Sequence, residues 1–289
     1  MTPDDYCQDK AVRNGSSLYY AFLFLSPEER RAINALYALR REVGDLVVQA
    51  GEESVARIKL AWWRAQIDEM VAGRPEHPVA RALQPHLEPY GIARERLQDI
   101  VDGMEMDLDQ SRYLDWAGLH RYCLQSAGTV AETSARILGH TDARTLDHAA
   151  RLGAAVRFAN IIRDVGADAR RGRIYLPIDE LQRFQVKAAD ILNGVHSERF
   201  EALMAFQAER ARGLFREALA TLPEADRRAQ RPGLIMAALQ HDLLSEIERD
   251  GWQVLQQRTS LTPLRKLWVA WKTWVGGGRG VLRRLGRAS

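Results

Sequence analysis

The chain has 289 residues, of which 46% are hydrophobic and 27% are charged, with 10 prolines and 21 glycines. This composition is typical of a globular protein and excludes a disordered or low-complexity chain. The formal net charge is +3, but residues 258–289 carry eight arginines and lysines and no acidic residue, which leaves −5 for residues 1–257. The basic character therefore belongs to the C-terminal segment.

The cysteines and the N-terminus indicate a location. Cys7 and Cys123 are too few for a disulfide framework and lie in no Cys/His cluster of metal spacing, so a reducing cytoplasm is expected. The acidic first ten residues lack the apolar segment of a signal peptide. No apolar run approaches the roughly 20 residues of a membrane-spanning helix. We therefore expect a cytoplasmic protein that is not integral to a membrane.

Apolar residues recur at helical spacing along almost the whole chain, and no stretch shows the period-two alternation of a strand. The first long helix is predicted to begin at Ser26, which forms a capping box with Glu29, and to end near residue 49. Six more long helices are predicted in chain order, at about 53–72, 92–110, 115–138, 143–168, 196–221 and 232–257. The sequence thus predicts an all-α protein, with one bundle-like domain over residues 1–257 and a basic, Trp-rich amphipathic tail over residues 258–289.

The helix predicted at 143–168 carries a polar stripe. Asn160, Asp164 and Asp168 are spaced i, i+4, i+8 and therefore share one face, beside apolar residues that favour the core. Oxygen ligands in this arrangement suit Mg²⁺, which binds few carboxylates and leaves its other positions to water and phosphate. The alternative is a solvated face whose carboxylates pair with nearby arginines.

The residues that follow the stripe favour the phosphate interpretation. Gly166 weakens the helix interior by about 1 kcal/mol relative to Ala, so stability alone does not explain it. Three arginines of the segment 170–173 can bind a phosphate that the metal also holds, and Gly172 lets the segment bend as a lid.

Five motifs carry a resemblance to a known family. They are NGSSLYYAFLFL at 14–25, ALYALRREVGD at 35–45, KLAWWRAQI at 59–67, DGMEMDLDQSRY at 102–113 and NIIRDVGADARRGRIYLP at 160–177. Over about Tyr6 to Trp252 the chain resembles the squalene/phytoene synthases, the head-to-head prenyltransferases. The first and last motifs are most similar to the bacterial presqualene diphosphate synthases of hopanoid pathways.

The resemblance implies a fold and a reaction. The fold is an isoprenoid-synthase-type helical bundle around a central apolar cavity, with two acidic helices facing each other across its mouth. The reaction is the Mg²⁺-dependent condensation of two farnesyl diphosphates to presqualene diphosphate, in which charge stabilisation of the leaving diphosphate is the main catalytic effect. Squalene, dehydrosqualene and phytoene synthases share these motifs, so the product stays open.

The resemblance also implies roles for individual residues. Tyr37 and Tyr122 would otherwise be core aromatics, and Arg41 a surface residue. The metal ligands implied are Asn160, Asp164, Asp168 and Asp45; the catalytic residues are Tyr37, Arg41 and Tyr122; the substrate-binding residues are Ser16, Ser17, Arg163, Arg171, Arg173 and Tyr175.

The chain departs from the family pattern at the mouth. Gly44 and Val48 stand where relatives have aspartates, and Asp45 lies about 100° around the helix from position 44. Arg157 replaces a common Gln and could act as a phosphate clamp, while Ala167 replaces an acidic residue. These changes leave a second hypothesis open, a catalytically weakened relative that binds isoprenoid or a partner enzyme. A non-enzymatic membrane adaptor is a third.

The tail repeats large apolar residues at helical spacing among basic ones. This pattern is typical of an interfacial amphipathic helix, although tryptophans packed on the bundle are an equal alternative and nucleic-acid binding a weaker one. The expected partners are farnesyl diphosphate, an anionic membrane surface and downstream hopanoid or squalene pathway enzymes, with no nucleic acid, at the inner face of the cell membrane. The pattern consists of Leu264, Leu267, Trp268, Trp271, Trp274 and Val275, with Arg265, Lys266 and Lys272 between them.

Overall fold

The computed structural model describes residues 1–11, 16–49, 52–278 and 280–281. Part of the first motif, residues 14–15, and most of the basic end of the tail, residues 279 and 282–289, lie outside these ranges. In this part of the chain the secondary structure is helical, and pairing between extended segments is limited to an isolated bridge between Arg112 and Ile174. The predicted all-α class is confirmed.

The helices follow the predicted order. The N-terminal half contains α1 (Pro3–Ala11), α2 (Ser17–Phe22), α3 (Pro27–Gln49), α4 (Glu53–Val71), α5 (Pro78–Leu83), the 3₁₀ turn η1 (Gln84–His86) and α6 (Arg94–Asp109). The middle contains α7 (Trp116–Cys123), the π-helical turn η2 (Leu124–Gly128), α8 (Thr129–Leu138) and α9 (Arg144–Ala169). The C-terminal part contains α10 (Ile178–Arg183), α11 (Ala188–Leu192), α12 (Glu198–Ala220), α13 (Arg231–Arg249), the 3₁₀ turn η3 (Gln253–Leu255) and α14 (Pro263–Val275).

Helix starts and stops explain most of these bounds. At α3, the Ser26 amide donates to Glu29 Oε2 at 2.9 Å and the Glu29 amide donates to Ser26 Oγ at 3.3 Å, which is the predicted capping box. The helix predicted over 232–257 was too long. It ends at Arg249 because Gly251 and Trp252 adopt positive φ angles of 64° and 57°, which turn the chain.

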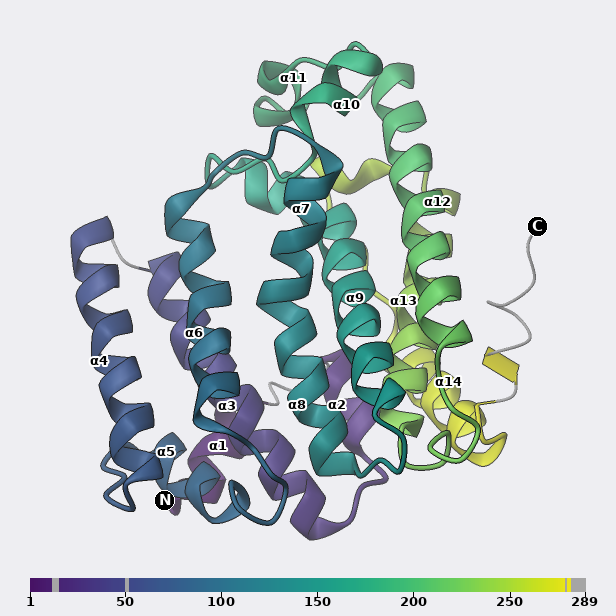
Figure 1. Cartoon of the computed structure of the whole chain (residues 1–289). Coiled ribbons are helices and arrows are strands. Elements are labelled where there is room, and N and C mark those ends of the chain that lie inside the picture. The colour runs from purple at the N-terminus through teal and green to yellow at the C-terminus, as the bar shows by residue number, and fades with distance from the viewer. Residues whose placement is uncertain (12–15, 50–51, 279, 282–289) are drawn as a thin grey trace.

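The central element is α9, which contacts α7, α8, α12 and α13 and is therefore buried on several sides. Figure 1 shows α4, α6, α8, α9 and α12 running alongside one another, with α3 and α1 behind α6 and with α10 and α11 at one end. Gly166 of α9 allows a close approach of η3: a Cβ there would lie 2.4 Å from the Leu255 carbonyl oxygen. Its presence thus has a packing reason that the sequence did not show.

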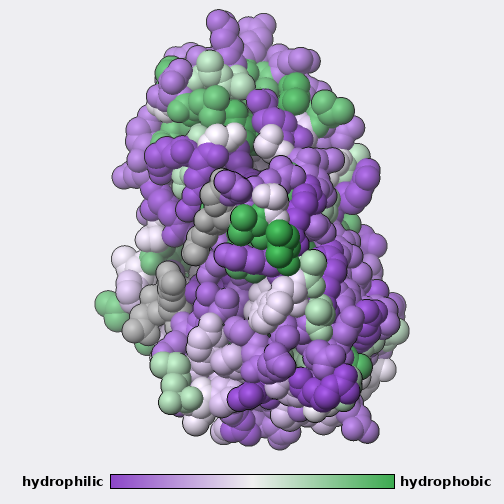
Figure 2. All heavy atoms as spheres, turned by 90° about the vertical axis from the view of Figure 1, so that its left-hand side faces the viewer, coloured by the Kyte–Doolittle hydropathy of each residue, from purple (hydrophilic) through white to green (hydrophobic). Residues whose placement is uncertain are grey.

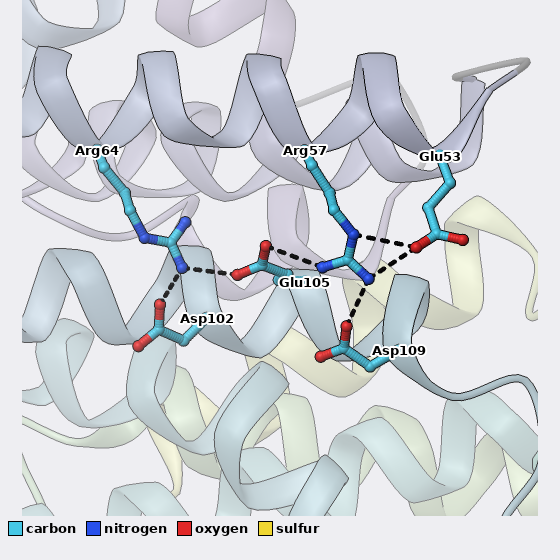
Figure 3. A network of polar contacts seen from close by, with 6 residues as sticks. All are labelled: Glu53, Arg57, Arg64, Asp102, Glu105 and Asp109. Atoms are coloured by element: carbon cyan, nitrogen blue, oxygen red, sulfur yellow. Dashed lines mark hydrogen bonds and ion pairs between the residues drawn. The ribbon is translucent and has the colours of Figure 1, made fainter.

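An ion-pair network joins α4 to α6 (Figure 3). Arg57 donates to Asp109 at 2.8 Å, and Arg64 donates to Glu105 at 2.8 Å. The carboxylates at 102, 105 and 109 therefore face α4 and have a structural role, whereas Asp107, within the same stretch of α6, is not part of this network. The network consists of Glu53, Arg57, Arg64, Asp102, Glu105 and Asp109.

The outer surfaces are mostly polar. The face that includes α4 is largely hydrophilic, with separate hydrophobic patches near its middle and its upper end (Figure 2). Among the described residues, none of the helices combines the length and apolar character needed to cross a bilayer.

The helix of the tail, α14, packs on α13 and α2. Trp274 stacks on Phe24 with 5.2 Å between ring centroids, and Ala270 is fully buried. On the other side, Trp268 and Trp271 are 58% and 47% exposed. One face of the predicted amphipathic helix thus contacts the bundle while the opposite face lies in solvent.

Candidate active site

The principal candidate site is a cavity of about 170 Å³ enclosed by α2, α3, α8, α9 and α13. Its walls are mainly apolar, and the α9 residues that line it run from His148 to Asn160. Twelve residues of α-helix span about 18 Å, so the cavity is long. The polar residues that line it include Tyr37, Arg40, Arg157 and Asn160.

On α3, two neighbouring arginines have different surroundings. Tyr37 and Arg40 line the cavity, and the Tyr37 ring lies 5.3 Å from the Phe22 ring. Burial raises the pKa of Tyr37, so the phenol stays neutral. Arg41 does not line the cavity; its Nη1 donates to the Lys10 carbonyl oxygen at 2.9 Å. The structure therefore brings the predicted Tyr37 to the cavity, together with Arg40 rather than Arg41.

Arg157 of α9 extends toward a group of tyrosines. Its Nη2 donates to the Tyr122 hydroxyl, and its guanidinium lies 5.1 Å from the centre of the Tyr122 ring and 5.4 Å from that of Tyr175. Both rings therefore contribute cation–π contacts. Its Nε has no hydrogen-bond partner among the residues that the structure describes.

Asp107 of α6 joins the same group, although no role for it was predicted from the sequence. It accepts hydrogen bonds from Tyr122 at 3.0 Å and from Tyr175 at 2.7 Å, and it pairs with Arg173 at 3.4 Å. Burial raises the pKa of Tyr175 to about 12, which keeps this hydroxyl a donor. The signal that could have identified Asp107 is its position within 102–109, because it falls off the face shared by the α4-facing carboxylates.

The predicted polar stripe of α9 is present, and its members have different partners. Asn160 Oδ1 accepts from Gln240 at 3.2 Å. Burial opposes ionisation of Asp164, but hydrogen bonds from Arg163 and, at 2.7 Å, Arg258 hold its pKa below the ordinary value. Within the described ranges, the Asp168 carboxylate forms no hydrogen bond or ion pair, and burial raises its pKa to about 6.

Helix α3, the first acidic helix, has fewer groups that could bind a metal ion than α9. Asp45 pairs with Lys10 at 3.0 Å, and the same ammonium lies 3.2 Å from Glu42. Val48 is 57% exposed and provides no oxygen ligand, and Gly44 has no side chain. The described residues contain no group of three or more His, Cys, Asp or Glu side chains placed to hold a metal. Asp45 is therefore not brought together with the α9 carboxylates as one metal centre.

These observations decide where a metal ion fits. Mg²⁺ needs only one or two protein carboxylates when a phosphate and waters complete its shell. The unpartnered Asp168 beside Asp164 and Asn160 fits one such ion on α9, whereas α3, with Asp45 held by Lys10, does not fit another.

The remaining predicted substrate-binding residues lie near the ends of elements. Ser16 caps α2 by accepting from the Tyr19 amide, and Ser17 is the first residue of that helix. Arg171 is exposed in the turn after α9. Its positive charge lowers the pKa of Asp168, against the larger effect of burial. Gly172 has a φ of 74°, so the chain turns there, and movement of this segment as a lid stays a prediction.

Comparisons with known proteins identify similar chains. A family model described as squalene/phytoene synthase matches residues 11–265. The chloroplastic phytoene synthase of an Oncidium hybrid cultivar is 33% identical over 285 residues, which cover 96% of this chain and 68% of the relative. The 15-cis-phytoene synthase of Synechocystis sp. is 33% identical over 282 residues, covering 92% of this chain and 84% of the relative.

Two solved structures have a similar fold. A dehydrosqualene synthase in complex with a ligand aligns with a TM-score of 0.82 and 24% identity, covering 95% of this chain and 96% of the other. A squalene synthase, HpnC from Alicyclobacillus acidocaldarius, aligns with a TM-score of 0.76 and 24% identity, covering 86% of this chain and 94% of the other.

Proposed function

This chain belongs to the squalene/phytoene synthase family, and we propose that it condenses two farnesyl diphosphates into presqualene diphosphate. Members of the family join prenyl diphosphates head to head and generally depend on Mg²⁺. The observation that carries the proposal is an apolar cavity whose polar lining includes Arg40, Arg157 and Asn160, the first residue of the polar stripe of α9. An apolar chain with a diphosphate at one end matches this distribution of charge.

In the proposed reaction, the C–O bond of one farnesyl diphosphate breaks and inorganic diphosphate leaves with the electron pair. The double bond of the second substrate attacks the allylic cation, and loss of a proton closes the cyclopropane of presqualene diphosphate. The apolar walls exclude water from the cation. Arg40 and Arg157 stabilise the charge that develops on the leaving diphosphate, and the Tyr37 ring faces the same space.

The acidic stripe of α9 supplies the proposed metal ligands. Asn160, Asp164 and Asp168 would hold Mg²⁺, which neutralises diphosphate charge when it is bound. Asp164 already accepts from Arg163 and Arg258, so Asp168 is the carboxylate that needs no rearrangement to act as a ligand.

The choice of farnesyl diphosphate rests on the first and last sequence motifs, which are most similar to those of presqualene diphosphate synthases. The relatives described above bear phytoene synthase names, so a phytoene or dehydrosqualene product is the alternative outcome of the product analysis.

A second candidate is a weakened relative that binds one isoprenoid diphosphate. Two observations favour it: Gly44 and Val48 supply no carboxylate on α3, and Asp45 is paired with Lys10. Turnover with a thirty-carbon product separates the two candidates.

The test is an assay of the purified protein with Mg²⁺ and either farnesyl or geranylgeranyl diphosphate. Diphosphate release and product mass are measured for the wild type, for Asp168→Asn and for the control Asp147→Asn. Asp147 is an exposed residue of the same helix that pairs with Arg151. We expect a thirty-carbon product, a loss of roughly a hundredfold in Asp168→Asn and no change in Asp147→Asn. Farnesyl diphosphate binding without diphosphate release contradicts the condensation and favours the second candidate.

We also propose that the exposed face of α14 rests on an anionic membrane at the cytoplasmic side. Leu264, Trp268, Trp271 and Val275 are spaced i, i+4, i+7, i+11 and form one exposed apolar stripe. The surrounding tail has no acidic residue, so its charge complements anionic lipid. The substrate and product of the proposed reaction are themselves amphipathic, which gives such contact a purpose.

A further inference from the structure

Arg40 and Arg157 reach the same cavity from two different helices. Arg40 lies on α3 and Arg157 on α9, and both line the cavity beside Tyr37 and Asn160. They interact electrostatically, because Arg157 is among the groups that lower the pKa of Arg40, after burial. Two positive charges therefore share one enclosed space.

Neither guanidinium has a carboxylate partner in the described ranges. Arg40 forms no hydrogen bond or ion pair there, and Arg157 donates only to the neutral Tyr122 hydroxyl, with its Nε unpartnered. The nearest acidic group of the tyrosine cluster, Asp107, is already bound to Tyr122, Tyr175 and Arg173. The tyrosine cluster with Asp107 outweighs burial at Arg157 and raises its pKa, whereas burial and the charge of Arg157 lower the pKa of Arg40. Arginine stays charged in proteins, so among the described residues Arg40 is the guanidinium that lacks a counterion in the ligand-free site, and an anion bound beside both arginines would supply one.

We infer that the Arg40–Arg157 pair binds the diphosphate of a prenyl diphosphate directly, without a metal ion between them. The inference rests on the proposed function, which places the leaving diphosphate beside this pair, and goes beyond it by making this anion site independent of a metal ion. Planar guanidinium groups match phosphate oxygens bidentately, and the low dielectric of the cavity strengthens such contacts. The apolar remainder of the cavity accommodates the prenyl chain of the same molecule.

The pair also compensates for the incomplete acidic motif of α3. Position 44 has no side chain and position 48 is an exposed valine, so α3 cannot assemble carboxylates around a metal. A metal would bring positive charge to a diphosphate. Arg40 on α3 and Arg157 on α9 supply positive charge in its place. One diphosphate is thus held by side chains and the other faces the acidic stripe of α9.

The test is calorimetric titration with inorganic pyrophosphate and with farnesyl thiolodiphosphate, a poorly reactive analogue, first in EDTA and then in excess Mg²⁺. We expect the wild type to bind the analogue in EDTA. Arg40→Gln and Arg157→Gln should each weaken this binding roughly tenfold or more, which corresponds to about 1.4 kcal/mol. Arg157→Lys keeps the positive charge but cannot form a bidentate contact with phosphate oxygens, so it should give an intermediate affinity. The control is Arg199→Gln, an exposed residue of α12 outside the cavity.

The outcomes distinguish this inference from the proposed function. Binding that needs Mg²⁺ in the wild type, or unchanged binding in both glutamine variants, overturns the role of the pair and leaves the condensation standing. Absence of binding in both buffers contradicts the proposed function as well. Thermal unfolding of each variant shows whether it is folded. If folded Arg157→Lys binds as tightly as the wild type while Arg40→Gln loses binding, a bidentate contact at residue 157 is not needed.

Discussion

Asp226 is a carboxylate that fastens the loop before α13 to the turn before α9. It is 2% exposed, and it accepts hydrogen bonds from the Thr141 amide at 2.8 Å, the Asp142 amide at 3.1 Å and the Thr145 hydroxyl at 2.5 Å. Burial opposes ionisation, but these donors outweigh it and lower the pKa of Asp226 to about 2. Both segments adjoin the cavity, since Gln230 and His148 line it.

We expect Asp226→Asn to lower the free energy of unfolding at pH 7 by about 2 kcal/mol, because an amide cannot satisfy the same donors. A carboxylate with a depressed folded pKa stabilises the fold above its unfolded pKa, near 3.8. This contribution is lost as the pH falls toward 2. Urea unfolding between pH 7 and pH 2 measures it. The surface variant Asp147→Asn should change by less than about 0.5 kcal/mol, and an equal loss in both variants would contradict the assignment.

Individual residues show what the sequence could predict of the site. The stripe of Asn160, Asp164 and Asp168 follows from helical spacing alone, and the structure places all three on α9. Which of Arg40 and Arg41 lines the cavity does not follow from the sequence. Neighbouring residues on a helix point about 100° apart, and only the packing of α3 determines which one faces the cavity. Arg258 was likewise unpredictable as a partner of Asp164, since a contact between residues 94 apart depends on the path of the chain.

Among the elements, η3 packs closely against α9 beside the acidic stripe. A Cβ at Gly166 would lie 2.4 Å from the Leu255 carbonyl and 2.5 Å from that of Val254, which are backbone atoms that cannot rotate away. Arg170 reinforces the contact by donating to the Leu255 oxygen at 3.2 Å.

We therefore expect Gly166→Ala to destabilise the protein by about 1–3 kcal/mol, despite the better helix propensity of Ala. Differential scanning calorimetry measures the change. The matched control is Gly213→Ala in α12, where a Cβ would meet nothing closer than 3.8 Å, and this variant should gain about 0.5–1 kcal/mol. A gain in both variants would show that η3 moves away without cost.

The long helices were predictable because apolar periodicity and capping are local. The end of α13 and the π-helical turn η2 were not, because a positive φ at Trp252 and an extra residue in a turn are imposed by tertiary packing. The roles of the α6 carboxylates could not be predicted from the sequence, because they also depend on tertiary packing. Only the arginines of α4 show that the residues at 102, 105 and 109 are structural, as Figure 3 illustrates.

At the scale of the whole molecule, α14 presents the exposed apolar stripe proposed to contact lipid. Sedimentation with vesicles tests it, with zwitterionic lipid alone compared with a mixture containing anionic lipid. The wild type should bind the anionic vesicles, and the double variant Trp268→Ala/Trp271→Ala should bind roughly tenfold or more weakly, because two large side chains no longer enter the interface.

Trp62 on α4 provides the matched control for this experiment. It is 45% exposed, compared with 47% for Trp271, and it lies on a different part of the surface. Trp62→Ala should therefore leave vesicle binding unchanged. Equal binding of the double variant and the wild type would remove the membrane role of α14 and leave its contact with α13 and α2 as its function.

The π-helical turn η2 (Leu124–Gly128) joins α7 to α8 and sets the rotation of α8 about the helix axis relative to α7. Tyr122 lies before the turn and meets Arg157 and Asp107, whereas Val130 and Ser134 lie after it and line the cavity. An α-helix advances by about 100° per residue, so deleting one residue from the turn would rotate α8 by that angle relative to Tyr122. The cavity wall and the tyrosine cluster could then no longer face the same space. A single extra residue thus keeps the tyrosine cluster and the cavity wall of α8 in register with each other.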